Sequence, residues 1–201
     1  MNRYFDVNSP DISALIEYAA LAYSKNLTNA CGGNVSIRHG DGMVISRTSS
    51  CLRSLEEKDL VYVSMDTETV FSVSGARPSK EYMMHLAIYK ARPDVSSVFH
   101  LHPPVSTAVS AMPGDFPATT ESAREKLPIL PKVPYAPAGS IELASSVEEV
   151  VRAGGEALHG TLLENHGILA FGNSPEAAFF IAELIEASAT NLIYKKILGL
   201  L

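Results

Sequence analysis

Four short strand-like segments follow one another between residues 34 and 73, with no helical pattern between them. Asn34–Arg38 and Met43–Ser46 are rich in apolar and β-branched residues, and the turn between them, His39–Gly42, contains an Asp-Gly pair suited to a hairpin. Leu60–Ser64 and Thr69–Val73 flank a second polar turn in the same way. Strands joined by such short turns are antiparallel, so the chain does not consist only of alternating parallel strand and helix units.

Helical patterns and further strands surround these hairpins. Helices are expected from Ser9-Pro10-Asp11 to about Asn26, and over about Lys80–Ala91, Pro103–Ala111, Ser140–Ala153 and Ser174–Leu198. Strands are expected over Val95–Leu101, about Leu130–Tyr135, Gly160–Leu163 and Ile168–Phe171. The stretch 113–137 is otherwise too rich in proline for long regular elements. The pattern predicts an α/β fold with three α/β/α layers around a mixed, largely antiparallel sheet, as one domain over residues 1–201.

Charge and composition exclude several classes of protein. The net charge is -6 and no lysine- or arginine-rich run is present, so nucleic acid is not an expected partner. Apolar stretches such as Ala177–Ile185 are interrupted by charges before the roughly 20 apolar residues that span a bilayer, and the N-terminus lacks a secretory pattern. The two cysteines, Cys31 and Cys51, are not at a metal-finger or redox spacing. A cytoplasmic protein with free thiols and no membrane partner is expected.

Three histidines form a candidate metal site. His100 and His102 stand at the end of an expected strand, where alternation points both rings to one face with Cα atoms roughly 7 Å apart. His166 also lies at a strand end, before Gly167, which lets the backbone turn sharply. Three protein ligands with one open position are the pattern of catalytic rather than structural zinc. A histidine at a strand end also serves often as a hydrogen-bonding loop residue.

Glu81 opens the helix that precedes the histidine strand, and His85 follows four residues later on the same helical face. A carboxylate beside an open metal position serves as a fourth ligand, or as a base that takes a proton from a hydroxyl or from a carbon next to a carbonyl. The alternative is a first-turn glutamate stabilised only by the helix dipole. His85 is expected either in the core or in support of the site, and His39 and His159 at the surface.

Turn residues with exposed donors predict an anion site. The segments are Gly32-Gly33-Asn34, Thr48-Ser49-Ser50 and Ser79-Lys80. Backbone N–H groups at glycines and at a helix N-terminus, together with hydroxyls and the Lys80 charge, suit a phosphate. The same residue types are also common in ordinary turns. No nucleotide-binding glycine fingerprint is present, which disfavours a nucleotide.

Five motifs follow one another along the chain: Gly33-Asn34-Val35-Ser36, Thr48, Pro78-Ser79-Lys80-Glu81, His100-Leu101-His102-Pro103 and Leu162-Leu163-Glu164-Asn165-His166-Gly167. In this order they resemble the class II aldolase and adducin family, most closely its fuculose-phosphate aldolase branch, and the resemblance covers about Asp11 to Tyr194. It implies a three-layer α/β/α fold and a cyclic homotetramer. It implies zinc, with manganese or cobalt as alternatives, held by His100, His102 and His166, and Glu81 as the catalytic acid and base. It also implies phosphate binding at Gly33, Asn34, Thr48, Ser49, Ser79 and Lys80.

The expected function is therefore a zinc-dependent lyase that cleaves a small phosphorylated ketose through a metal-stabilised enediolate. Two departures keep alternatives open. Lys80 stands where such aldolases typically have serine, and a Ser-Lys-Glu motif is more similar to the branch that decarboxylates oxo-tetronate phosphates. The family's loop and tail tyrosines have no counterpart in Thr119–Arg124 or beyond Leu201, and Tyr82, Tyr135 and Tyr194 are unplaced. Decarboxylation of a sugar-acid phosphate and epimerisation remain alternatives, whereas a non-enzymatic adducin-like role is disfavoured because all three histidines and Glu81 are present.

Overall fold

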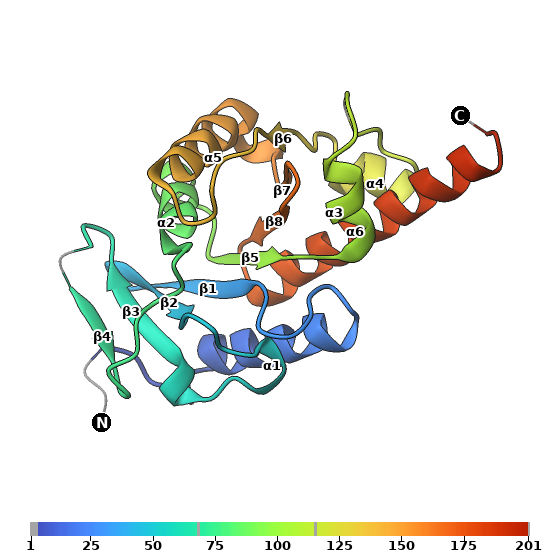
Figure 1. The fold of residues 1–201 in the computed structure, drawn as a ribbon. Helices are drawn as coiled ribbons and strands as arrows, with labels where there is room; N and C mark the ends of the chain where they lie inside the picture. The colour runs from blue at the N-terminus through green and yellow to red at the C-terminus, as the bar shows by residue number, and fades with distance from the viewer. Residues whose placement is uncertain (1–3, 68, 115, 201) are drawn as a thin grey trace.

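A computed structural model describes residues 4–67, 69–114 and 116–200 of the chain (Figure 1). The helices are α1 (Pro10–Ser24), α2 (Tyr82–Ala91), α3 (Pro104–Ser110), α4 (Glu121–Lys126), α5 (Ile141–Gly154) and α6 (Pro175–Ile197). The strands are β1 (Asn34–His39), β2 (Gly42–Ser46), β3 (Leu60–Ser64), β4 (Val70–Ser72), β5 (Ser97–Leu101), β6 (Lys132–Val133), β7 (Gly160–Leu163) and β8 (Gly167–Gly172). Short 3-10 turns occur at Leu52–Ser54, Glu57–Asp59 and Gly155–Ala157.

The eight strands form one sheet in the order β4-β3-β2-β1-β5-β8-β7-β6. Within the described residues, neighbouring strands pair antiparallel except β6 and β7, which run parallel. This confirms the prediction of an α/β fold with a mixed, largely antiparallel sheet. The register of β1 and β5 places Asn34 opposite His100, so residues from distant parts of the sequence become neighbours on one face.

Helices cover both faces of the sheet, which gives the predicted layers (Figure 1). On one face, α1 and α6 pack on residues such as Val35, Ile37 and Phe99. On the other face, α2 and α5 lie side by side and pack on residues such as Ile45 and Val98. Side chains along β1 alternate between the two faces because a strand has a period of two.

Three local details differ from the sequence predictions. The hairpin turn between β1 and β2 is centred on Gly40 and Asp41, not on the Asp-Gly pair, and only Gly40 has a positive φ, of 56°. The strand expected around residues 130–135 is reduced to the two residues of β6, because prolines at 131 and 134 flank it. The proline-rich stretch contains the short helix α4, whose N-cap Thr120 accepts a hydrogen bond from the Ala123 N–H.

Among the described helices, α6 is long and apolar enough to cross a membrane by length and composition. Phe179, Ala182 and Ile185 on this helix are buried against the sheet and α1, whereas Phe180 and Ile197 are exposed.

Candidate active site

His100 lies inside β5 and is completely buried. Its Nδ1 is 3.0 Å from the carbonyl oxygen of Ile168 on β8. A carbonyl can only accept, so Nδ1–H donates there and Nε2 of the neutral ring carries the lone pair. The neighbouring strand therefore sets the ring orientation and tautomer that a metal ligand requires.

His102 follows the end of β5, where the chain enters α3. The Glu186 carboxylate of α6 accepts hydrogen bonds from the N–H groups of Val105 (3.0 Å) and Ser106 (2.7 Å) in the first turn of α3. A carboxylate at a helix N-terminus stabilises it through unpaired N–H groups and the dipole. The direction in which the chain leaves His102 is thus held by a residue far along the sequence.

His166 lies in the turn between β7 and β8. Asn165 has a positive φ of 55°, and its N–H donates to the Ser110 Oγ of α3 at 3.0 Å. Gly167 meets β5 so closely that a Cβ there would lie 2.4 Å from the Leu101 carbonyl oxygen and 2.8 Å from the His102 ring. The glycine after His166 is therefore required by close packing, which lets the two histidine-bearing segments approach each other.

The three histidines converge with ligand atoms within 4.8 Å of one another. The Nε2 atoms of His100 and His102 are 2.9 Å apart. Glu81 completes the cluster, with its carboxylate oxygens 3.3 Å from His100 Nε2 and 3.2 Å from His166 Nε2. Three imidazole nitrogens facing one point form a donor set that is consistent with a divalent metal.

Glu81 is buried, with 5% of its surface exposed, at the N-cap position of α2. Burial acts to raise the pKa of Glu81, but the interactions of its carboxylate with the His100 and His166 rings outweigh burial and hold the pKa far below its usual range. Its Oε2 accepts from Asn34 Nδ2 at 3.0 Å, whereas the buried Oε1 has no hydrogen-bond partner. Burial, reinforced by the neighbouring His100 and His166 rings, lowers the pKa of His102 to about 3, so this ring is neutral and available as a ligand.

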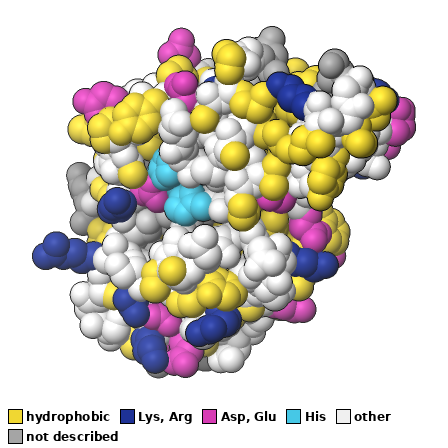
Figure 2. Space-filling model, turned by 45° about the vertical axis from the view of Figure 1, so that its right-hand side comes forward, with side chains coloured by type: hydrophobic (Ala, Val, Ile, Leu, Met, Phe, Trp, Pro, Cys, Tyr) yellow, Lys and Arg dark blue, Asp and Glu magenta, His cyan; other side chains and the backbone are white. Residues whose placement is uncertain are grey.

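A pocket of about 250 Å³ adjoins this cluster. Its lining includes His102, His166, Glu81 and all six residues predicted to bind phosphate: Gly33, Asn34, Thr48, Ser49, Ser79 and Lys80. Lys80 is exposed, and Ser79 is buried with its Oγ accepting from the Glu81 N–H at 3.3 Å. Residues assigned from three distant segments therefore share one cavity. Histidine side chains are open to solvent on one face of the molecule in Figure 2, in line with the partial exposure of His102 and His166.

The pocket also contains Cys31, Gly32, Arg47 and Ala138, which were not predicted as site residues, although Gly32 lies in a segment predicted to ring an anion. The Arg47 Nε donates to Asp59 Oδ1 at 2.7 Å, so the guanidinium is held at one orientation beside Thr48 and Ser49. The sequence did contain a signal for Arg47, because this basic residue directly precedes the predicted anion-binding segment Thr48-Ser49-Ser50. Ala138 carried no such signal, because only the tertiary fold brings its loop to the site.

Other candidates lie away from the pocket. Tyr82, Tyr135 and Tyr194 do not line it in the described part of the chain. His39 ends β1, and His159 lines a separate hollow beside Arg92. Both are partly exposed, as expected for residues outside a metal site. Cys31 and Cys51 are free thiols, as predicted.

Comparison with known proteins places the chain among aldolases. The family Class II Aldolase and Adducin N-terminal domain matches residues 13–193. The L-fuculose phosphate aldolase of Methanococcus maripaludis (strain C7) is 31% identical over 179 residues, which cover 89% of this chain and 94% of that protein. The 5-deoxy-D-ribulose 1-phosphate aldolase of Bacillus thuringiensis is 30% identical, over 92% of this chain and 85% of that protein.

Solved structures agree with this relationship. An L-fuculose 1-phosphate aldolase superposes with a TM-score of 0.83 and 27% identity, over 95% of this chain and 89% of that one. YgbL of Klebsiella pneumoniae, for which aldolase, epimerase and decarboxylase activities are considered, gives 0.83 and 25% identity, over 91% of this chain and 88% of that one. The relatives confirm the prediction of an enzyme of the metal-dependent class II lyase type. The chain belongs to the class II aldolase and adducin family.

Proposed function

We propose that this chain is a zinc-dependent aldolase that cleaves a small phosphorylated ketose. One observation carries the proposal: three imidazole nitrogens and the Glu81 carboxylate meet at one point beside a pocket lined by hydroxyls, glycines and Lys80. Relatives at about 30% identity that are named as sugar-phosphate aldolases support the same assignment.

The metal-binding end and the phosphate-binding end of the site have separate roles. His100, His102 and His166 would hold zinc, or manganese or cobalt in its place, and the ion would supply Lewis acidity to substrate oxygens that become negative as the carbon bond breaks. The phosphate would be bound by the hydroxyls of Thr48, Ser49 and Ser79, by the positive charge of Lys80, and by backbone N–H groups at Gly33 and Asn34. The substrate would thereby be fixed with its carbonyl end toward Glu81.

Glu81 would move the proton. Its ionised carboxylate takes the hydroxyl proton of the carbon that leaves as an aldehyde, while the electrons of the broken carbon–carbon bond pass to the ketone fragment as an enediolate. Glu81 then returns the proton to carbon, so atoms and charge balance over the cycle. Because Oε1 has no hydrogen-bond partner, this oxygen is the one free to carry the proton.

A coupled assay tests the proposal. The protein is loaded with zinc and incubated with a panel of 1-phosphorylated ketoses, and dihydroxyacetone phosphate is measured together with the matching aldehyde. Cleavage by the zinc-loaded protein that stops after chelation and returns with zinc is the expected result. Absence of cleavage across the panel, with zinc shown to be bound, would remove the aldolase assignment.

Lys80 favours decarboxylation of a 3-oxo-tetronate-phosphate-like acid as the second candidate. An exposed ammonium group in the pocket is suited to a second anionic group such as a carboxylate. Release of carbon dioxide from an oxo acid phosphate, without aldol cleavage of ketose phosphates, would favour it. Replacement of Lys80 by serine should then weaken use of the acid by about 10-fold or more while leaving zinc in place. Epimerisation would appear as a new ketose phosphate without any cleavage product.

We further propose a single domain that works in the cytoplasm as a homotetramer, with a small phosphorylated sugar or sugar acid as its partner molecule. The mass in solution, measured by light scattering during size-exclusion chromatography, tests the assembly. A monomer of 21.6 kDa at working concentration would contradict it.

A further inference from the structure

A series of buried polar side chains leads from Glu81 into the layer between α2 and β1. Asn34 Nδ2 lies 3.0 Å from Glu81 Oε2, and Asn34 Oδ1 lies 2.6 Å from His85 Nε2. On the other side of the ring, Ser36 Oγ lies 2.6 Å from His85 Nδ1 and 2.8 Å from the Tyr89 hydroxyl. Four consecutive short contacts therefore connect the proposed acid and base to Tyr89.

Secondary structure places these groups in contact. Asn34 and Ser36 are two residues apart on β1, so both face α2, while Val35 and Ile37 face α1. His85 and Tyr89 are four residues apart on α2 and share the face toward β1. Asn34, Ser36, His85 and Tyr89 have exposed fractions of 3%, 0%, 0% and 1%. Water does not compete for their hydrogen bonds.

The direction of every bond follows from chemistry. A carboxylate offers only lone pairs, so the Asn34 nitrogen faces Glu81 and the Asn34 oxygen faces His85. His85 Nε2 must then donate, and since burial lowers the pKa of His85 to about 3 the ring is neutral and its Nδ1 accepts. The Ser36 hydroxyl donates to that nitrogen, which leaves its oxygen to accept from the Tyr89 hydroxyl at 2.8 Å; the Ser96 carbonyl oxygen is a second, longer acceptor for Tyr89 at 3.4 Å. All four donors point toward Glu81.

We infer that His85 is a positioning residue for Glu81, acting through Asn34, and that Ser36 and Tyr89 hold His85 in the Nε2–H tautomer. The inference rests on the proposed function of Glu81 as the proton carrier. Asn34 occupies Oε2, on the side of His100, and leaves Oε1 directed at His166 without a hydrogen-bond partner. The chain of bonds thus determines which carboxylate oxygen receives the proton.

Burial makes the arrangement rigid. If one of these side chains exchanged its donor and acceptor positions, a donor would face a donor or an acceptor would face an acceptor. Each buried group left unpaired in this way costs about 1–3 kcal/mol of folding free energy. The Asn34 amide alone could turn over, because its two ends have similar size. The neutral Nε2–H tautomer of His85 prevents this, since it presents a donor that only the amide oxygen satisfies.

Neutron diffraction from the deuterated, zinc-loaded protein tests the tautomer independently of any substrate. Deuterium is expected on His85 Nε2, on the Asn34 nitrogen toward Glu81 and on Ser36 Oγ toward His85 Nδ1. Deuterium on His85 Nδ1, or an Asn34 amide turned the other way, would overturn the inference even in an active aldolase. The expected map in a protein without aldolase activity would remove the proposed function and leave the arrangement intact.

A matched pair of variants tests the effect on catalysis. Ser36→Thr and Ser36→Val add the same volume, but only threonine keeps the hydroxyl that donates to His85. Ser36→Val should lower kcat by about 10- to 100-fold with zinc retained and KM changed less than roughly threefold, and Ser36→Thr should recover most of the loss. Ser97→Ala removes an equally buried hydroxyl that donates to the Ser36 carbonyl at 2.9 Å, outside this chain of bonds, and should leave kcat near that of the wild type. Equal kcat values for the Thr and Val variants would overturn the inference.

Discussion

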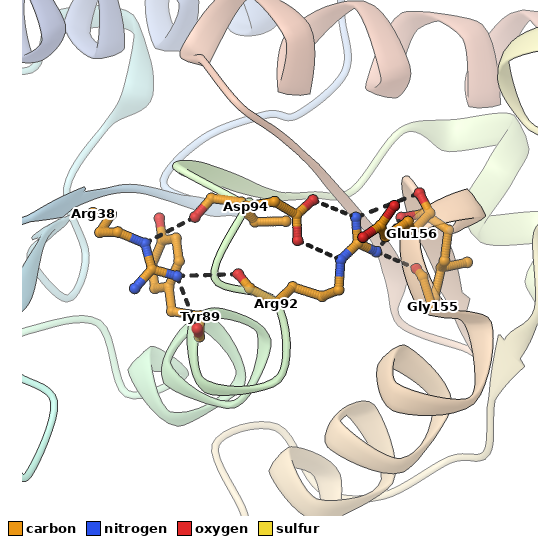
Figure 3. A network of polar contacts seen from close by, with 8 residues as sticks. Arg38, Tyr89, Arg92, Asp94, Gly155 and Glu156 are labelled. Carbon is orange, nitrogen blue, oxygen red and sulfur yellow. Dashed lines mark hydrogen bonds and ion pairs between the residues drawn. The ribbon is translucent and has the colours of Figure 1, made fainter.

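The two ends of β5 carry polar clusters of opposite character. At its carboxyl end, His100, His102 and Glu81 point ligand nitrogens and a carboxylate at one centre. Before its amino end, Arg92 closes a network with Asp94 and the backbone around Gly155 (Figure 3). The cluster at the carboxyl end directs unused lone pairs into a pocket. The Arg92 cluster uses its donors in hydrogen bonds within the cluster.

The Arg92 network is saturated. Its Nε and one terminal nitrogen donate to Asp94 at 2.8 and 2.6 Å, and the terminal nitrogens also donate to the carbonyl oxygens of Gly155, Glu156 and Leu158. Arg38 likewise donates to the carbonyl oxygens of Tyr89, Arg92 and Val95. These hydrogen bonds join loop ends to the sheet.

Cavity size does not separate the two regions. The hollow beside Arg92 and His159 has a volume of about 580 Å³, against about 250 Å³ for the pocket at Glu81. The smaller cavity has the convergent groups and the buried carboxylate oxygen without a hydrogen-bond partner. The comparison teaches that unsatisfied, convergent groups indicate function better than empty volume does.

The largest effect is expected when a ligand is removed from the convergent cluster. His102→Ala should reduce bound zinc below about one tenth of an equivalent and abolish activity. Even the loss of a residue that only hydrogen-bonds to a metal ligand lowers metal affinity or activity by about 10- to 100-fold. Metal content is measured by mass spectrometry of the purified protein. His39→Ala, a histidine outside the site, should keep full metal, and retention of zinc by His102→Ala would break the comparison.

Glu81→Gln should keep the zinc and lose turnover. Removal of a positioned acid and base costs about 10²- to 10⁴-fold in kcat. Zinc content and kcat are measured on the same preparation, with Glu164→Gln as a control for loss of a nearby carboxylate that does not line the pocket. Full activity of Glu81→Gln would exclude its proton-transfer role.

Arg92→Met should act on stability and not on the metal. The methionine fills part of the space but leaves buried carbonyl groups unpaired, so the free energy of unfolding should fall by about 3 kcal/mol. Urea denaturation measures the loss. Arg152→Met, at an exposed pair with Glu148, should cost less than about 0.5 kcal/mol. A loss of zinc in Arg92→Met would show that the two regions are coupled.

The smallest effect concerns pH. The hydrogen bond and charge of Arg92 hold the pKa of Asp94 below its ordinary value. A carboxyl whose folded pKa is lowered stabilises the fold above its unfolded pKa, near 3.9, and this contribution is lost as the pH falls through the folded value. Since the Asp94 side chain is 54% exposed, Asp94→Asn should cost less than about 1 kcal/mol at pH 7.

Urea titrations from pH 7 to pH 3 measure this difference. The gap in unfolding free energy between wild type and Asp94→Asn should stay constant down to about pH 5 and narrow below about pH 4. A gap that widened on acidification would contradict the assignment of the ion pair.

Local patterns predicted most of the fold. The turns at residues 39–42 and 65–68 and the alternation of β1 led to the antiparallel sheet, because these signals depend on residues close in sequence. Helix α4 was not expected, since its six residues lie in a proline-rich stretch and are held by contact with α6. The role of Arg47 was missed for the same reason. It depends on Asp59, which is distant in the sequence and is brought beside Arg47 by the pairing of β2 with β3.

By itself, the sequence determined which segments become strands and helices and which side chains are able to bind a metal or an anion, because periodicity and side-chain chemistry are local properties. Tertiary structure alone decided that Asn34 stands opposite His100, that His166 reaches Glu81, and that His85 holds Asn34 between them. These relations depend on strand register and on helix packing over β1. Both arise from long-range burial of apolar surface, which no short stretch of sequence contains.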